Sequence, residues 1–287
     1  MENNSHYQNS VHQPSMKSRW NAGSALRSLV LASLVLLAPS AYSQAMLSGF
    51  NSSSLVRNDD DSFGPVSLGF TINFYGVDVS SVYINNNGNV TLQSSYETYT
   101  PGPLDDVGQL IIAPFFADVD TSNRGLAVTY GTGMVGGHAA FGVTWHDVAY
   151  FGSSSATQLN DFQLIIIDRS DVAAKDFDFW FNYDGILWET GNASDGSLGL
   201  GGSSARVGYA NGLGNTLELE GSAVNGAFLD GGPNALISGR LNSDTDGRYI
   251  FNVRGGDAVP EPTTATLIGL GIGLYALRRR RNASRLI

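Results

Sequence analysis

The chain contains no cysteine, and this absence limits both how it folds and what chemistry it can perform. Disulfide bonds, cysteine metal sites and thiol catalysis are excluded, so packing and hydrogen bonds alone hold the folded part together. Histidine is also scarce, with four in 287 residues. His6 and His12 lie near the N-terminus, which leaves His138 and His146. Two histidines cannot build a three-histidine zinc centre.

Positive charge is nearly missing from the middle of the chain. The whole sequence has 16 Lys and Arg against 26 Asp and Glu, a net charge of −10. Eight of the basic residues lie in the two terminal segments, so residues 46–259 hold eight basic and 24 acidic residues. Such a body repels nucleic acid, which we exclude as a partner, and attracts divalent cations such as calcium.

Long apolar runs are confined to the two ends of the chain. Three basic residues precede the N-terminal run LVLASLVLLA: Lys17, Arg19 and Arg27. Small residues follow the run in APSAYSQA, and this order predicts a signal peptide over residues 1–45, with a signal helix. Signal peptidase would cut after Ser43 or Ala45, and Met16 is an alternative start. The run is too short to cross a bilayer of about 30 Å, although a retained anchor is the alternative.

The second apolar run lies in the C-terminal segment VPEPTTATLIGLGIGLYALRRRRN. Proline disfavours helix at its own position and at the residue before it, so Pro260, Glu261 and Pro262 predict an extended approach. Residues 263–277 are uncharged and give about 22 Å of helix at ~1.5 Å per residue. This is a short transmembrane helix, which snorkelling arginines can extend. Four arginines follow and hold the cytoplasmic side of the inner membrane: Arg278, Arg279, Arg280 and Arg281.

Alternating apolar and polar residues predict β structure for residues 46–257. The stretches FTINFYG, VYINNNGNVTL and DFDFWFNYDG have the period of two that is typical of half-buried strands. Two continuous apolar runs, residues 110–116 and 162–167, predict central strands that are covered on both faces.

Turn and helix signals complete the fold prediction. Asn87-Gly88 predicts a two-residue hairpin turn, and Asp184-Gly185 predicts a turn that leads to Trp188. The 35 glycines argue against long helices, and only residues 104–108 and 170–175 suit short ones. The fold class is therefore mainly β, a single antiparallel β-sandwich-like domain with short helices.

Seven stretches follow one another between about residues 63 and 253: FTINFYG, VYINNNGNVTL, IIAPFFADVDT, GVTWHDVAYF, NDFQLIIID, FWFNYDGILWET and ARVGYANG. Their order resembles the nidogen-like extracellular (NIDO) domain family, and IIAPFFADVDT is the most specific of them. Phe116 departs from the pattern, because family members more often have Trp there. The resemblance implies an extracellular β-rich domain linked to adhesion, with no catalytic residues to transfer.

The tail, residues 258–287, resembles the PEP-CTERM sorting signal of Gram-negative bacteria in its Pro-Glu-Pro, apolar segment and arginine cluster. This resemblance implies recognition and processing by an exosortase, a membrane enzyme. Together with the signal peptide, it predicts export through the inner membrane and a transient C-terminal anchor. The body would then lie at the cell surface or outside the cell. A permanent single-span anchor is the alternative.

Asp118 and Asp120 form the most suggestive acidic pair. On a continuing strand both carboxylates project from one face, about 7 Å apart at ~3.3 Å of rise per residue. That spacing suits part of a calcium site or an inverting glycosidase. The alternative is a turn in which the carboxylates accept backbone amides.

NSDTDGRYIF matches the start of a calcium loop, with Asn242, Asp244 and Asp246 at positions one, three and five. Position twelve is Val253 rather than glutamate, so an Asp-Gly hairpin turn into the last strand is the alternative. Residues 58–61 form a further acidic run, which we expect to be a solvated loop.

Two other groups of residues bear on chemistry. His146 and Asp147 are neighbours in the sequence, and on a strand their side chains would point to opposite faces, which predicts no dyad. Trp145, Trp180 and Trp188 have the right chemistry to stack on sugar rings, but a place in the core is the commoner role for such residues.

These features predict a non-enzymatic surface or matrix protein that acts in cell-matrix adhesion or biofilm formation. Its expected partners are signal peptidase, an exosortase, and extracellular polysaccharide or matrix components. The alternatives are a carbohydrate-binding module of the exopolysaccharide and a secreted glycoside hydrolase that uses Asp118, Asp120 or another carboxylate pair.

Overall fold

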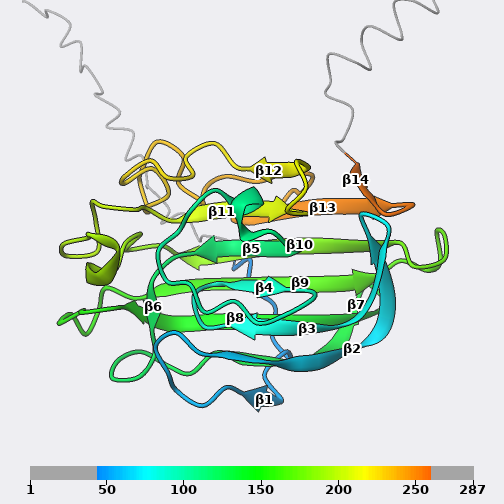
Figure 1. Ribbon diagram of the computed structural model, residues 1–287, viewed down its shortest axis with the longest axis horizontal. Helices are drawn as coiled ribbons and strands as arrows, with labels where there is room; N and C mark the ends of the chain where they lie inside the picture. Colours follow the sequence, from blue (N-terminus) through cyan, green and yellow to red (C-terminus); the bar gives the residue numbers. More distant parts are fainter. Residues whose placement is uncertain (1–43, 260–287) are drawn as a thin grey trace, which may run out of the picture. The chain divides into compact units, whose positions relative to one another are not determined.

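The computed structural model describes residues 44–259 (Figure 1). The signal peptide prediction therefore lies almost entirely outside the described residues, and so does the tail from Pro260 onward, with its transmembrane helix and arginines. No helix between residues 44 and 259 is long and apolar enough to cross a membrane.

Two antiparallel sheets make up the described body. The first sheet, sheet A, has the order β1-β7-β8-β9-β10-β13-β14, and β6 pairs with β8. Its strands are β1 (Ser53–Ser54), β6 (Val119–Asp120), β7 (Thr129–Val135), β8 (His138–Tyr150), β9 (Asn160–Asp168), β10 (Phe177–Gly185), β13 (Arg248–Arg254) and β14 (Asp257–Val259). The second, sheet B, has the order β12-β11-β5-β4-β3-β2. Its strands are β2 (Ser62–Phe74), β3 (Val77–Asn85), β4 (Asn89–Thr91), β5 (Ile111–Phe116), β11 (Arg206–Ala210) and β12 (Thr216–Glu218).

The two sheets share one aromatic core. Phe74 on β2 lies edge-on to Phe177 on β10, with ring centroids 5.5 Å apart. Phe115 on β5 packs against Phe162 on β9 at 5.2 Å. Figure 1 looks through both sheets, whose strands run in nearly the same direction, as in an aligned sandwich. The predicted antiparallel β-sandwich-like fold is confirmed.

The two predicted central strands are buried on both faces because a second cover lies over each sheet. All six residues of β5 are buried, and its outward side chains pack under Leu104. Residues 162–167 of β9 are also buried, and its outward Ile165 packs under Phe50. Each strand therefore needs apolar residues at consecutive positions, which explains the continuous runs.

Residues 44–51 supply the cover of sheet A. Leu47 exchanges two hydrogen bonds with Gln163 on β9, of 2.9 and 2.8 Å. Further along, Phe50 lies over Gly133 and Gly142, where a Cβ atom would come within 2.9 and 2.6 Å of its ring. Glycine at these positions lets the ring approach the sheet closely.

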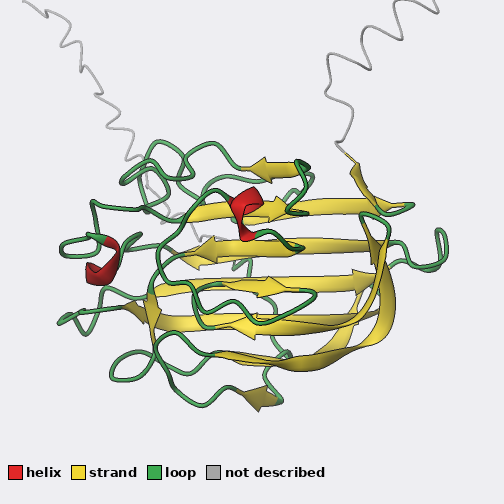
Figure 2. Ribbon diagram, in the orientation of Figure 1, coloured by secondary structure: helices red, strands yellow, loops and turns green. Residues whose placement is uncertain are grey.

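Helical structure is minimal in the described residues, as Figure 2 shows. The 3₁₀ helix η1 (Leu104–Val107) confirms the short helix predicted there, and η2 (Asn192–Ser194) is a second one. The helix predicted at residues 170–175 is wrong. Single backbone hydrogen bonds close separate turns there, and Lys175 has a φ of 67°, which no right-handed helix allows.

The two predicted turns differ from the structure. A three-residue connection, residues 86–88, joins β3 to β4 in place of the two-residue turn. Gly88 remains essential, because a Cβ there would lie 1.8 Å from the carbonyl oxygen of Phe115. The Asp184-Gly185 turn is wrong, since β10 ends there without a hairpin partner. Asp184 instead accepts hydrogen bonds from the backbone of Ala45 and Met46.

Candidate functional site

Three carboxylates meet at one place in the body and form what we call the acidic cluster. Asp59, Asp60 and Asp118 each offer an oxygen, and these atoms lie within 4.8 Å of one another. Asp118 is 1% exposed and comes directly after β5, in the ADVDT stretch. The other two come from the loop before β2. Carboxylate oxygens at this spacing are the ligands that calcium prefers.

Two asparagines of the β3–β4 connection hold the acidic cluster together. Asn86 donates to the carbonyl oxygens of Asp59 and Val119, at 2.5 and 2.6 Å. Asn87 donates to a carboxylate oxygen of Asp60 at 3.0 Å. Residues 58–61 form a loop as expected, but only Asp61 is exposed, and Asn58, Asp59 and Asp60 are partly buried. These bonds turn the loop inward against β6.

The acidic cluster lacks a compensating positive charge. Among residues 44–259, no Lys, Arg or His nitrogen lies within 4.0 Å of its carboxylates. Burial, and then the charges of Asp59 and Asp60, raise the pKa of Asp118 to about 7. Burial, and then the charges of Asp60 and Asp120, raise the pKa of Asp59 to about 7. One oxygen of Asp59 is buried without a hydrogen-bond partner. A bound cation would relieve each of these features.

Asp120 is a neighbour of the acidic cluster rather than a member. Its carboxylate accepts from the backbone N–H of Ser122 at 2.7 Å and from the hydroxyl of the same residue at 2.5 Å. This is the turn role that the sequence left open as an alternative. Of the predicted pair, only Asp118 joins other carboxylates.

The second predicted calcium segment lies apart from any cluster of this kind. Asp246 pairs with Arg240 at 2.7 Å, and Asn242 donates to the carbonyl oxygen of Ile250 at 3.1 Å. Asp244 is exposed and belongs to no group of three acidic or histidine side chains within residues 44–259. The expected hairpin is also absent, because the bridge that precedes β13 is parallel.

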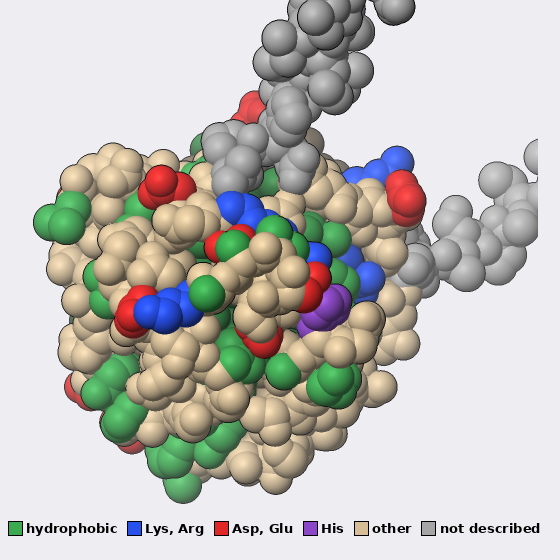
Figure 3. Space-filling model, turned by 90° about the vertical axis from the view of Figure 1, so that its right-hand side faces the viewer, with side chains coloured by type: hydrophobic (Ala, Val, Ile, Leu, Met, Phe, Trp, Pro, Cys, Tyr) green, Lys and Arg blue, Asp and Glu red, His purple; other side chains and the backbone are tan. Residues whose placement is uncertain are grey.

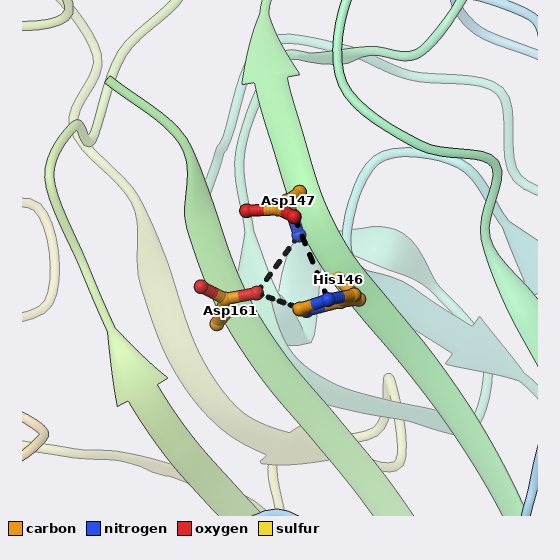
Figure 4. A group of neighbouring side chains, drawn as sticks. All are labelled: His146, Asp147 and Asp161. Carbon is orange, nitrogen blue, oxygen red and sulfur yellow. Dashed lines mark hydrogen bonds and ion pairs between the residues drawn. The ribbon is translucent and has the colours of Figure 1, made fainter. Parts of the chain in front are cut away.

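A second group of titratable side chains lies where β8 and β9 meet (Figure 4). Nδ1 of His146 is 2.5 Å from an oxygen of Asp161, and Nε2 is 3.5 Å from an oxygen of Asp147. The prediction that His146 and Asp147 point apart is wrong. A register shift between Trp145 and Val148 interrupts the alternation of the strand.

Two of the three tryptophans considered for sugar stacking are not accessible. Trp145 and Trp188 are both 0% exposed, and their indole nitrogens donate to backbone carbonyl oxygens. Trp180 is partly exposed, but the guanidinium of Arg248 lies over its ring at 4.9 Å. The core role predicted for buried aromatics holds for the first two.

Charges of both signs lie together on the face drawn in Figure 3, where basic side chains sit beside acidic ones. A group of mixed charge surrounds Asp178, which is 5% exposed. Arg169 bonds its carboxylate at 2.6 Å, and a nitrogen of Arg254 lies 2.7 Å from the other oxygen, at an angle unsuited to a hydrogen bond. The charge of Asp178 is therefore compensated by two arginines.

Comparison with known proteins extends the resemblance seen in the sequence. The family model described as "Nidogen-like domain" matches residues 80–135 and 128–255. The model of the PEP-CTERM protein-sorting motif matches residues 258–281. No solved structure matches the chain.

Two kinds of curated relatives match the body. Alpha-tectorin of Mus musculus is 32% identical over 236 residues, 73% of this chain and 10% of that protein. Nidogen of Drosophila melanogaster is 27% identical over 256 residues, 76% of this chain and 18% of that protein. The chain therefore spans less than a fifth of the length of these relatives.

Proposed function

Because the chain belongs to the nidogen-like domain family and ends in a PEP-CTERM sorting motif, we propose that it mediates adhesion between a bacterial cell and its extracellular matrix. The family and the motif mark an exported surface or extracellular protein. The motif also implies processing by sorting machinery of the exosortase type. The proposal rests on the presence of a nidogen-like domain and a PEP-CTERM sorting motif in one chain.

The first experiment follows the fate of the tail. Deletion of residues 263–287 should change how the protein distributes among inner membrane, cell surface and medium. A matched control replaces the four arginines that begin at Arg278 by lysine, which keeps the positive charge. Identical fractionation of the deletion variant and the parent would contradict sorting by the tail. Intact mass spectrometry of the exported protein should give both mature termini.

The proposed partner is extracellular polysaccharide or another component of the matrix. Burial of Trp145 and Trp188 favours adhesion over a carbohydrate-binding module, because neither ring is free to stack on sugar. Cells that lack the protein should attach to their own purified matrix less well than the parent strain. Restoring the full chain should restore attachment. If cells that lack the protein attach as well as the parent strain, the proposed role is refuted.

A catalytic role fits the geometry poorly. Glycosidases place their two carboxyl groups about 5–9.5 Å apart, with room for a sugar between them. In the acidic cluster one oxygen of each of the three carboxylates lies within 4.8 Å of the others, and Asp118 is 1% exposed, which leaves no room for a sugar between them. We therefore propose no enzymatic activity. Release of reducing ends from matrix polysaccharide by the purified protein, and its loss in Asp118→Asn, would favour the hydrolase alternative.

Calcium binding is the second function that we propose, at the acidic cluster. Its support is the unpartnered buried oxygen of Asp59 and the absence of a neighbouring basic group in the described residues. Asp59, Asp60 and Asp118 would supply carboxylate oxygens, and water would supply further ligands. Binding would offset most of the negative charge of the site and so reduce its repulsion of acidic matrix polymers. An unchanged melting temperature in excess calcium, relative to chelator, would remove this proposal.

A further inference from the structure

A bulge in β8 turns His146 and Asp147 to the same side of the strand, as Figure 4 shows. Asp147 has a φ of 50°, a conformation that aspartate tolerates better than most residues. Its N–H donates to Asp161 at 2.8 Å, and its carbonyl oxygen accepts from Leu126 at 3.1 Å. The bulge is therefore fixed by contacts on both sides before any ligand arrives.

Asp161 orients the imidazole ring of His146. Nδ1 lies 2.5 Å from a carboxylate oxygen, which can only accept, so in the neutral ring Nδ1 carries the hydrogen and Nε2 has the lone pair. This is the arrangement that stands behind metal-binding histidines, in which a carboxylate sets the tautomer. Nε2 in turn faces Asp147 at 3.5 Å. Two ligands bound to one tetrahedral zinc ion at ~2.1 Å are about 3.4 Å apart, so this gap fits an ion.

Charge and access favour the same interpretation. Among residues 44–259, no Lys or Arg lies within 4.0 Å of the carboxylates of Asp147 and Asp161. Asp230 is a further carboxylate in these surroundings: burial raises its pKa most, and the charge of Asp161 also raises it. The side chain of His146 is 55% exposed and lines a pocket of about 560 Å³. Coordination positions beyond the two protein ligands would face solvent.

We propose that Nε2 of His146 and a carboxylate oxygen of Asp147 bind a zinc ion, with Asp161 positioning the histidine. Imidazole nitrogen favours zinc over calcium, which prefers oxygen ligands alone. Two coordination positions would remain for water or for an external donor such as a carboxylate. The site is separate from the acidic cluster and does not depend on the adhesion function.

Isothermal titration of the full chain with zinc sulfate tests the proposal. The chain should carry His6→Gln and His12→Gln, so that the two N-terminal histidines do not compete. One zinc ion should bind per chain, and His146→Gln should abolish this binding. Asp161→Asn should weaken it about 10-fold, as loss of a partner behind a metal ligand does. His138→Gln is the matched control and should bind as the parent does, although His138 also lies 3.5 Å from an aspartate.

A spectroscopic readout separates metal binding from a structural role. Copper(II) bound at the same site should show coupling to one nitrogen in its electron paramagnetic resonance spectrum, and His146→Gln should remove that coupling. Melting in chelator should be similar for parent and variant, which shows that the fold is intact. Absence of saturable zinc binding by the parent, or equal binding by His146→Gln, would overturn the proposal.

Discussion

Phe50 lies directly on Gly142: a Cβ atom added to that glycine would come 2.6 Å from Cγ of the ring. The ring closes the outer face of sheet A together with Ile165 and Ile167. An extra methyl group at this position has no space to enter, since Cδ1 of Ile165 would also be only 2.7 Å away.

Gly142→Ala should therefore destabilise the body by about 1–3 kcal/mol, the usual cost of overpacking. For a domain of this size, that lowers the melting temperature by roughly 2–10 °C. Gly102→Ala is the control, because no atom lies within 4 Å of the added Cβ there. Equal melting temperatures for the two variants would show that Phe50 does not seal the sheet.

Glu189 should make the stability of the body depend on pH. Its carboxylate is 0% exposed and accepts from the N–H groups of Gly226 and Phe228, both at 2.6 Å. Burial raises its pKa above the usual 4.5, so the folded state holds this proton more tightly than the unfolded state does. The free energy of unfolding therefore falls as pH rises from 4.5 through the raised pKa.

Glu189→Gln removes that titration. The amide has one oxygen in place of two, so one of the two buried N–H groups loses its acceptor, which lowers the free energy of unfolding by about 1–3 kcal/mol. The variant should melt below the parent at low pH, and the difference should shrink as pH rises. Glu97→Gln, at an exposed side chain, serves as the control. Parallel melting curves for Glu189→Gln and the parent across pH 4–8 would contradict the assignment.

Asp118→Asn should have opposite effects in chelator and in calcium. At pH 8 the parent carries an ionised Asp118 whose pKa of about 7 marks that charge as unfavourable in the folded state. The neutral variant should therefore melt several degrees higher than the parent in chelator. In calcium at 100 times the Kd, the parent should gain about 2.7 kcal/mol, and the variant much less.

Asp244→Asn is the matched control for this experiment, because Asp244 lies in the other predicted calcium segment. It should leave the calcium response unchanged. If Asp244→Asn abolished the response and Asp118→Asn did not, the segment of residues 242–246 would be the calcium site.

Asn86→Ala should release the loop that carries Asp59. Its side chain bonds two backbone carbonyl oxygens, and each buried acceptor left unpaired costs about 1–3 kcal/mol. We expect a large fall in melting temperature and a weaker calcium response. Asn123→Ala, at an exposed position, should change neither. A normal calcium response in Asn86→Ala would mean that the loop holds its place without this side chain.

The strands could be predicted from local sequence, because a period of two and continuous apolar runs report burial directly. The runs at residues 110–116 and 162–167 are confirmed as central strands for this reason. The covers that bury their outer faces could not be predicted. Phe50 lies far from β9 in the sequence and reaches it only through the tertiary fold. Leu104 comes shortly before β5, but no periodicity shows that the chain folds back over that strand.

The sites were harder to predict, because each depends on one local departure from regular structure. Asp118 stood out in the sequence, but its partners Asp59 and Asp60 are about sixty residues away and join it only through two asparagines. The DDD run beside Asn58 was the available signal. His146 and Asp147 needed a bulge, which strand periodicity alone does not reveal.

The carboxylate of Asp184 accepts hydrogen bonds from the N–H groups of Ala45 and Met46 at 2.7 and 3.2 Å. Both predicted cleavage points lie within two residues of these amides. Cleavage at either point would create a terminal ammonium group near this carboxylate, and an ion pair would be added to the amide–carboxylate hydrogen bonds. The new N-terminus would then be held against sheet A by an ion pair with Asp184 on β10.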